Sequence, residues 1–533
     1  MKRIPYLWSV LVIALLSATS CSGPAEKPPR PLIIADPVPP PLNATPTDRQ
    51  NTESALEATE NMGAGILELT VNNAILMAVS NNISLEVERL NPQIRATYEE
   101  QEKAVFDPEI EGTVSTDKTE EMQPTGSDIT EMHEGSISLK KYFPSGTILA
   151  LGVTGEKSDS DWFNPRYEAQ TRLGLTFTQA LMRGFGAEAN LARLRQSRLE
   201  TQISNYELRG FAEHLVAEVE QAYWDYALAL RKIEIVEESL KVAEQQLAET
   251  KEMIIVGTMA ESEMAAVQAE VAEQMQEIID AKSAKETAKL RLVQLLNPPG
   301  FDRWSREIKP IHPPELPKAT IEEIGLHMAV AMKMRPEINQ ARLNFQKGEI
   351  EIVRTKNGLL PVMDLFITLG KSGYAESFSR SVDDLTGHGY DVGLGIKVEY
   401  PLFNRDAEAT HRRATLELEQ FGKALDNLSQ IIEMDVRKAH IEVERTRKQI
   451  AASSATREFQ EEKLRIETEK FRVGRSTNFM VAQAQRDLLL SRINEVEAAV
   501  DYLKALVDFY RLEGSLLERR GIEAPGRELS TKF

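Results

Sequence analysis

Few residues of this 533-residue chain have side chains that could form or break a covalent bond. Cys21 is the only cysteine, so the chain cannot form an internal disulfide. It directly follows an apolar run and four small residues, which is where a cysteine is acylated when an exported lipoprotein loses its signal peptide. We therefore predict a lipid anchor at Cys21 rather than a catalytic thiol.

The densest group of possible metal ligands is formed by Glu131, His133 and Glu134. The seven histidines form no HExxH pattern, and a short polar stretch of this kind usually faces solvent. Two glycine-containing fragments, residues 184–186 and 393–395, lack the full spacing of a phosphate-binding loop. We expect no metal site, no cofactor and no enzymatic activity.

The charge of the chain limits its partners. Lys and Arg total 63 against 82 Asp and Glu, which gives a net charge of -19. A surface this acidic repels phosphate groups, so nucleic acid is excluded as a partner. With 27% charged and only 6% aromatic residues, the composition favours long, solvent-exposed helices over a compact enzyme.

The N-terminus carries an export signal. Lys2 and Arg3 precede the apolar residues 7–16 and the small residues 17–20, which predicts a signal peptide over residues 1–20. No later stretch approaches the roughly 18 uninterrupted apolar residues that a membrane-spanning helix needs. Any crossing of a membrane must therefore use β-strands.

The cleavage region resembles a bacterial lipobox, with one departure. Ala18 stands where Leu is usual, and together with Ser20 it also suits ordinary signal peptidase. Ser22, rather than Asp, follows the cysteine, as in lipoproteins that are sorted to the outer membrane. Residues 21–66 are rich in proline at their start, which predicts an extended, lipid-anchored tether.

The rest of the chain contains an internal duplication. An offset of 253 positions aligns five residues of the first half with identical ones in the second: Ala78, Arg89, Leu90, Gln93 and Pro108 with Ala331, Arg342, Leu343, Gln346 and Pro361. Two further offsets, 221 and 217, align later segments in the same order. We predict a first repeat over residues 67–297, a linker over 298–320, a second repeat over 321–517 and a tail over 518–533.

Each repeat is predicted to hold a shorter helix, a β segment, one very long helix, a glycine-centred turn and a medium helix. Apolar residues at spacings of three and four indicate the helices. The long helices, residues 186–255 and 406–472, would each reach about 100 Å. The shorter ones, placed end to end, match that length: residues 69–105 with 258–296, and 321–358 with 476–513.

The β segments alternate apolar with polar or small residues, most clearly over residues 172–179 and 392–400. Such strands suit a membrane barrel that has lipid on one side and water on the other, or a small soluble sheet with one solvent-exposed face. Four strands cannot close a barrel of useful width. The barrel interpretation therefore requires a homo-oligomer.

The chain resembles the TolC family of outer-membrane efflux proteins from about residue 67 to 517. The residues that carry the resemblance are residues 69–74 with Asn81 and Asn82, the strand-to-helix corners 178–186 and 400–404, and the turns 256–258 and 471–475. The resemblance implies a homotrimer with a twelve-stranded barrel in the outer membrane and a twelve-helix tunnel in the periplasm. The implied fold is mainly α with a transmembrane β-barrel portion, built from a duplicated helix-strand-helix protomer.

The first β segment departs from that pattern. It spans 72 positions from Pro108 to Ala180, against 40 from Pro361 to Pro401 in the second repeat. The extra stretch lies around residues 140–152, and its Phe-Pro-Ser-Gly-Thr motif indicates a turn between two strands. These are additional barrel strands or an accessory hairpin, and of the two we favour the hairpin.

In this family the glycine turns form the periplasmic tip, where an adaptor protein docks. Glycine suits a sharp reversal between helices because it reaches left-handed dihedral angles without a Cβ clash. We therefore predict docking at Val256, Gly257, Thr258, Val473 and Gly474.

Family channels often carry acids just after the second turn, and matching places Met480 and Gln483 there. A ring of Met480 side chains would constrict the pore by apolar contact, while Gln483 offers uncharged hydrogen bonds. Glu261 and Glu263, after the first turn, could supply negative charge instead. These four residues are the candidate gate.

The sequence thus predicts a passive duct of a tripartite efflux or type I secretion system. An adaptor bound to an inner-membrane pump would open the duct, and the energy for transport would come from these partners. The alternative is a periplasmic adaptor or scaffold lipoprotein with coiled-coil hairpins. An adaptor of that kind would have one hairpin and a soluble β domain, whereas this sequence predicts two homologous hairpins.

Overall fold

The computed structural model describes residues 66–123, 126–160, 168–299, 303–311 and 323–523. All of them belong to one compact unit, residues 64–533. The predicted signal peptide, Cys21 and nearly all of the predicted tether lie outside the described residues, as do parts of the predicted linker and tail.

The helices of the first repeat follow the predicted order, with two additional breaks, at Asn82 and at Leu191. They are α3 (Val71–Asn81), α4 (Ile83–Ala104), the short α5 (Ala187–Asn190), α6 (Ala192–Ile255) and α7 (Glu263–Leu296). The helix predicted over 69–105 is two helices, because Asn82 leaves the helical conformation at ψ 117°. Its side chain accepts a hydrogen bond from Leu85 N at 3.1 Å and donates one to Leu295 O at 2.9 Å. Asn82 therefore caps α4 and ties it to the end of α7.

The second repeat has the same plan. Its helices are α8 (Ile324–Met334), α9 (Pro336–Gly358), the short α10 (Phe378–Asp383) with the 3-10 helix η3 (Asp384–Thr386), α11 (Arg405–Arg472), α12 (Asn478–Glu513) and the short α13 (Leu516–Arg519). The break between α8 and α9 falls at Arg335, which precedes a proline and is extended at ψ 130°. Arg335 is 253 positions after Asn82, so the two breaks obey the offset of the sequence repeat.

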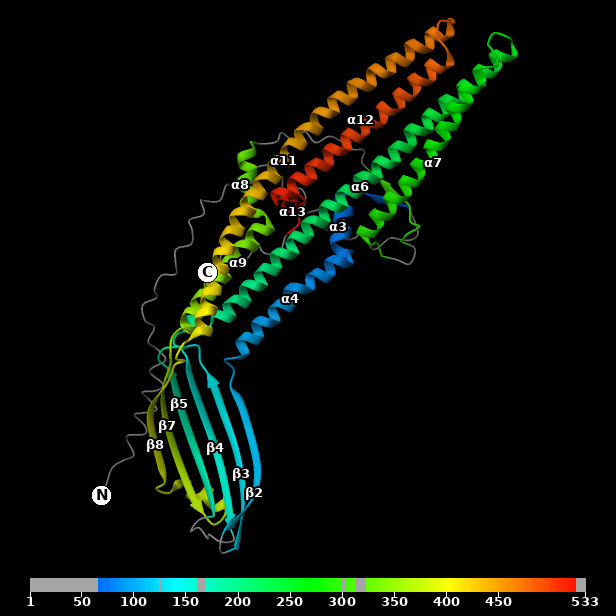
Figure 1. The fold of residues 1–533 in the computed structure, drawn as a ribbon. Coiled ribbons are helices and arrows are strands. Elements are labelled where there is room, and N and C mark those ends of the chain that lie inside the picture. Colours follow the sequence, from blue (N-terminus) through cyan, green and yellow to red (C-terminus); the bar gives the residue numbers. More distant parts are fainter. Residues whose placement is uncertain (1–65, 124–125, 161–167, 300–302, 312–322, 524–533) are drawn as a thin grey trace. The chain divides into compact units, whose positions relative to one another are not determined.

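The helices lie side by side in the same order along their whole length. Near the sheet the neighbours are α4, α6, α9 and α11, and farther away they are α7, α6, α12 and α11 (Figure 1). Two shorter helices therefore lie end to end beside each long one, as the lengths predicted. At every level each chain supplies a layer of four helices.

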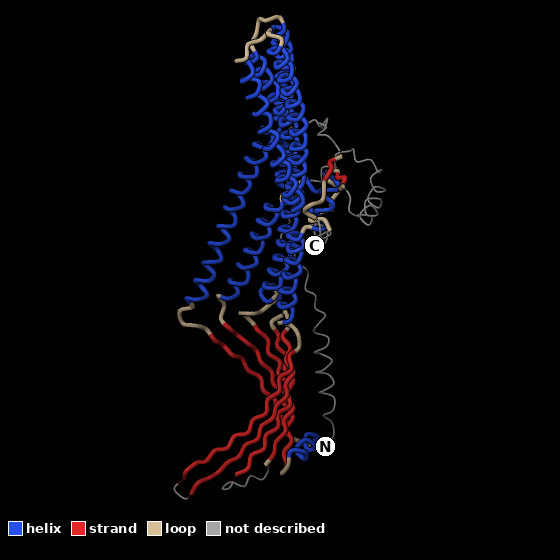
Figure 2. The backbone as a smooth tube through the Cα atoms, turned by 90° about the vertical axis from the view of Figure 1, so that its right-hand side faces the viewer, coloured by secondary structure: helices blue, strands red, loops and turns tan. Residues whose placement is uncertain are grey.

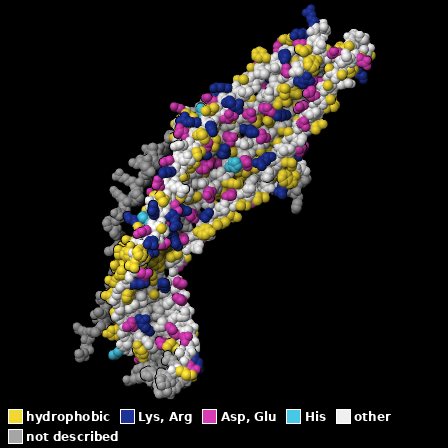
Figure 3. All heavy atoms as spheres, in the orientation of Figure 1, with side chains coloured by type: hydrophobic (Ala, Val, Ile, Leu, Met, Phe, Trp, Pro, Cys, Tyr) yellow, Lys and Arg dark blue, Asp and Glu magenta, His cyan; other side chains and the backbone are white. Residues whose placement is uncertain are grey.

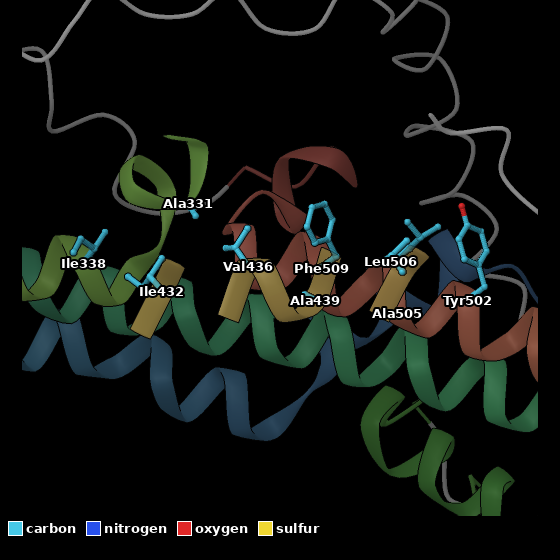
Figure 4. Close-up of a cluster of buried hydrophobic side chains, with 10 residues drawn as sticks. Ala331, Ile338, Ile432, Val436, Ala439, Tyr502, Ala505, Leu506 and Phe509 are labelled. Carbon is cyan, nitrogen blue, oxygen red and sulfur yellow. The ribbon is translucent and has the colours of Figure 1, made fainter. Parts of the chain in front are cut away.

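The helices are held together by an apolar core of mostly small and medium side chains. One cluster comes from α8, α9, α11 and α12 (Figure 4): Ala331, Ile338, Ile432, Val436, Ala439, Val443, Tyr502, Ala505, Leu506 and Phe509. A second cluster joins the repeats through Ile235 and Val236 of α6 and Leu489 of α12. Alanines at the contacts let helix axes approach closely, which suits long helices that pack side by side.

The sheet has six strands, all antiparallel to their neighbours, in the order β2-β3-β4-β5-β7-β8. The strands are β2 (Glu109–Gln123), β3 (Gly126–Tyr142), β4 (Thr147–Ser160), β5 (Ala169–Ala180), β7 (Val362–Ala375) and β8 (Tyr390–Glu399). The helices meet the sheet at one of its ends (Figure 2). The pairing of β5 with β7 joins the two repeats.

Two expectations about this sheet are corrected by the structure. The favoured accessory hairpin in the first repeat is wrong, because the extra strands pair continuously with the rest of the sheet. A twelve-stranded barrel made by three chains implies four strands per chain, whereas the main sheet of this chain has six. The turn at residues 143–147 does join two strands, β3 and β4, as its motif predicted.

A smaller sheet pairs the start of the first repeat with the segment predicted as a linker. β1 (Leu67–Leu69) lies parallel to β6 (Ile308–Pro310). Tyr223 and Tyr226 of α6 donate hydrogen bonds to Leu69 O at 3.1 Å and to Ile308 O at 2.8 Å. These bonds fix the small sheet against α6.

None of the helices described combines the length and the apolar composition that crossing a bilayer requires.

Candidate functional site

The two predicted tips are built in the same way. Val256 caps α6, Gly257 follows at φ 77°, and Thr258 N donates to Met253 O at 2.9 Å. At the second tip Gly474 has φ 72°, and Arg475 N donates to Lys470 O at 2.8 Å. Both are Schellman motifs, in which a left-handed glycine lets the chain satisfy the last helical carbonyls.

The tips lie at the end of the helices opposite to the sheet (Figure 1). The valines that precede the glycines point outward, with Val256 73% exposed and Val473 69% exposed. Ile255 and Phe479 beside them are also exposed. The predicted docking residues thus form two small apolar ends on otherwise charged hairpins, which suits contact with another protein.

The four predicted gate residues lie just beyond these turns, in different surroundings. Met480 is exposed near the start of α12, and Glu261 is exposed in the loop that joins α6 to α7. Glu263, the first residue of α7, is half-buried. Gln483 donates to Asp487 Oδ1 at 2.9 Å and accepts from Arg486 Nη2 at 3.3 Å. Within one chain, Gln483 is therefore the member held by a polar network.

A set of polar side chains between the two hairpins was not anticipated from the sequence. Asn478, the first residue of α12, is fully buried and donates to Met259 Sδ at 3.4 Å. Gln246 of α6 donates to Asn478 Oδ1 at 3.3 Å and accepts from Gln485 Nε2 at 2.6 Å. The glutamine-rich start of α12 was the signal, since buried amides need partners on a neighbouring helix.

An ion pair with a buried carboxylate also links the hairpins. Arg486 Nη1 of α12 lies 2.8 Å from Glu270 Oε2 and 3.2 Å from Glu273 Oε2, both on α7. Only 3% of Glu270 is exposed, and burial raises its pKa, while Arg486 partly offsets that effect. This pair and the amides around Asn478 fasten the hairpins together next to the predicted gate.

A second buried ion pair lies between α6 and the C-terminal helix. Arg209 lies 3.2 Å from Glu213 Oε1 and 2.7 Å from Glu518 Oε1. Burial raises the pKa of Glu213 to about 7, even though Arg209 favours the charged form. Arg520 also pairs with the buried Glu220 through Nε at 3.0 Å. These contacts attach residues 516–520 to α6.

One face of the six-stranded sheet carries an apolar row that crosses all six strands, while farther from the helices the same face also carries the Lys118–Glu131 pair. The register aligns one residue from each strand in a single row: Ile110, Leu139, Leu151, Leu175, Leu369 and Val392. We call this side of the sheet the apolar face. Figure 3 shows hydrophobic side chains gathered over the end of the sheet nearest the helices, whereas the helices carry mixed charges.

The opposite face is polar. The row next to the apolar one reads, across the same strands, Glu111, Ser138, Gly152, Gly174, Gly370 and Asp391. Arg172 of β5 reaches Asp391 of β8 at 2.7 Å. A Cβ at Gly174 would lie 2.7 Å from the Arg172 guanidinium, and one at Gly370 would lie 2.0 Å from the Asp391 carboxylate. The glycines therefore make room for a charged pair across three strands.

The residues considered as metal ligands do not form a site. Glu131 pairs with Lys118 at 2.5 Å, and His133 lies 3.1 Å from Thr116 Oγ1. Glu134 points to the opposite face, because side chains alternate along β3. Among the residues that the structure places, no group of three or more His, Cys, Asp or Glu side chains could hold a metal ion.

Comparison with known proteins agrees with this architecture. A family model described as outer membrane efflux protein matches residues 141–298 and 329–515. Among solved structures, the outer-membrane channel OprN has a TM-score of 0.64 at 16% identity, over 84% of this chain and 90% of that chain. VceC of Vibrio cholerae has a TM-score of 0.62 at 15% identity, over 83% and 96%.

The open state of the MtrE channel of Neisseria gonorrhoeae has a TM-score of 0.59 at 16% identity, over 84% of this chain and 89% of that chain. No curated protein sequence matches the chain. At these identities the solved structures establish the fold, while the family match covers more than half of the sequence. The resemblance to outer-membrane efflux proteins that the corner and turn segments predicted is confirmed. The chain belongs to the outer membrane efflux protein family.

Proposed function

We propose that this protein is the outer-membrane channel subunit of a tripartite efflux or type I secretion system, and that it acts as a passive duct. The observation that carries the proposal is the two-sided sheet. The apolar row that crosses all six strands on one face, with the Arg172–Asp391 pair on the other, suits strands with lipid outside and water inside.

The duct requires more than one copy of the chain. β2 and β8 are the two edge strands of the sheet, and an edge strand in a membrane must find a partner for its backbone groups. Three copies, the number that the family resemblance implies, would close the sheet into a barrel. The same assembly would join the four-helix layers into a periplasmic tunnel.

The tips supply the contacts for the rest of the system. An adaptor protein docks on Val256, Gly257, Thr258, Val473 and Gly474, where exposed valines top each hairpin. The adaptor, bound to an inner-membrane pump, separates the hairpins and opens the pore lined by Met480, Gln483, Glu261 and Glu263. The Arg486–Glu270 pair holds the closed arrangement until then. A lipid on Cys21 adds an anchor in the outer membrane.

The alternative, an adaptor or scaffold lipoprotein, accounts for less of the molecule. Such a protein needs one helical hairpin, whereas this chain has two that share a capping motif. It also needs no sheet with an apolar row across all of its strands. The comparisons likewise concern channels rather than adaptors.

Planar-bilayer recording of the detergent-purified protein tests the proposal. We expect discrete channels with a small resting conductance that rises when purified adaptor is added. A protein that extracts without detergent and never conducts would instead support the adaptor alternative. The matched control is Leu175→Arg, which places a charge on the apolar face and should prevent insertion.

A further inference from the structure

The number of strands that each chain contributes determines the width of the barrel. β2 and most of β3 precede residue 141, where the family model begins to match. These two strands are nevertheless built like the others. Ile110 of β2 and Leu139 of β3 occupy the apolar row, and Glu111 and Ser138 occupy the polar row.

The turn between β3 and β4 is fixed to the base of the helical layer. Asn190 Nδ2 donates to Pro144 O at 2.9 Å, and Gly186 N donates to Ser145 O at 3.2 Å. Thr147 Oγ1 donates to Gln179 Oε1 at 2.6 Å across to β5. An accessory hairpin folded away from the barrel would lose these bonds. The turn that ends β3 therefore lies beside the end of β5, where β5 runs into the helices, so β3 belongs to the main sheet.

The widths of the two layers also agree. Strands about 4.8 Å apart and tilted by about 40° each occupy about 6 Å of circumference, so six strands cover about 38 Å. Four helices packed about 8–10 Å apart cover about 32–40 Å. Four strands would cover only about 25 Å and would narrow the duct at the membrane.

The edge strands are suited to one another. β2 and β8 run in opposite directions within the sheet, so β8 of one copy can pair antiparallel with β2 of the next. Their apolar residues are also strongly exposed in a single chain: Val114 is 90% exposed on β2 and Leu394 is 73% exposed on β8.

We infer that three copies close an eighteen-stranded barrel by pairing β2 of each chain with β8 of the next. The inference rests on the proposed function, since it concerns the same membrane sheet. The barrel is then about 1.5 times as wide as a twelve-stranded one, because diameter grows roughly linearly with strand number. It matches the helical tunnel in width, so the periplasmic tip rather than the membrane segment limits the size of the cargo.

Disulfide trapping in native membranes tests the pairing. Ile110→Cys or Val114→Cys in β2 is combined with Val392→Cys, Leu394→Cys or Ile396→Cys in β8. Leu149→Cys or Val153→Cys in β4, combined with the same β8 partners, forms the matched set. All of these residues lie on the apolar face. In the inferred barrel β4 is three strand spacings, about 14 Å, from β8 of either copy, which is too far for a disulfide.

We expect oxidation to convert β2–β8 pairs into two- and three-chain species, and to leave β4–β8 pairs as monomers on a denaturing gel. Each variant with one introduced cysteine, in addition to the native Cys21, shows the background of nonspecific crosslinking. Crosslinks from β4 but not β2 would mean a twelve-stranded barrel, which overturns the inference and leaves the channel proposal intact. A trimer without β2–β8 crosslinks in any combination also overturns it. A chain that stays monomeric in the membrane would defeat both.

Discussion

Arg486 of α12 reaches the buried carboxylate of Glu270 on α7 at 2.8 Å, and so connects the two helical hairpins of one chain close to their turns. The same guanidinium donates to Gln483, one of the predicted gate residues. A single side chain therefore joins the packing of the hairpins to the lining proposed for the pore. Separation of the hairpins has to break this contact.

Arg486→Ala should loosen the closed tip. Removing the guanidinium leaves a buried carboxylate without its charged partner, a cost of roughly 1–3 kcal/mol. We expect a larger resting conductance in planar bilayers and a lower melting temperature. The matched control is Arg465→Ala, which removes an exposed pair with Glu462 inside one helix. Equal resting conductance in the two variants would argue against Arg486 as a latch.

A charge on the apolar face should act differently from one on the polar face. Leu175 and Thr176 are neighbours on β5 and point to opposite sides of the sheet. Leu175→Arg should cost about 2–4 kcal/mol at the membrane midplane and reduce the amount of trimer in the outer membrane. Thr176→Arg should leave assembly intact. Similar losses in both variants would show that the apolar face does not meet lipid.

The tip glycines should resist replacement because of their backbone conformation. Gly257 and Gly474 have φ of 77° and 72°, where a Cβ costs about 1–2 kcal/mol. Alanine at either position should accelerate hydrogen exchange of the capping amide, Thr258 or Arg475, by about five- to thirty-fold. Gly358→Ala, at the end of α9 and in open space, is the control and should change little. Unchanged exchange in the tip variants would contradict the Schellman assignment.

The buried Glu213 should make stability depend on pH. Its pKa rises from an ordinary 4.5 to about 7 because burial disfavours the carboxylate, with Arg209, Glu518 and Glu337 as the charged groups around it. The folded state therefore binds the proton more tightly. This contribution is fully present below pH 4.5, is lost as pH rises through 7, and amounts to about 3 kcal/mol at most.

Thermal unfolding in detergent from pH 5 to 8 measures this effect. The melting temperature of the wild type should fall with rising pH, and Glu213→Gln should flatten that part of the curve and be the more stable protein at pH 8. Glu207→Gln, an exposed residue on the same helix, should keep the wild-type slope. A slope that Glu213→Gln leaves unchanged would assign the pH dependence to other groups.

Features encoded by neighbouring residues could be predicted from the sequence. Apolar spacing gave the long helices to within a few residues, because one face of each helix packs along its whole length. The tips at Gly257 and Gly474 were found because a left-handed helix end favours glycine wherever it occurs. The duplication added a check, since each feature appears twice.

Features that depend on partners far away in the sequence could not be predicted. Asparagine is a common helix cap, but the hydrogen bond of Asn82 to Leu295, 213 residues later, could not be predicted from the residues around Asn82. The Arg486–Glu270 pair depends on which helices become neighbours. The length of the first β segment showed extra strands, but only the pairing of β3 with β4 showed that they join the main sheet.

Native mass spectrometry of the full-length protein, extracted from membranes in mild detergent, tests the central claim most directly. We predict a complex of three chains that depends on detergent for its solubility. A single chain that remains monomeric and soluble when detergent is removed would contradict the barrel, the tunnel and the gate together.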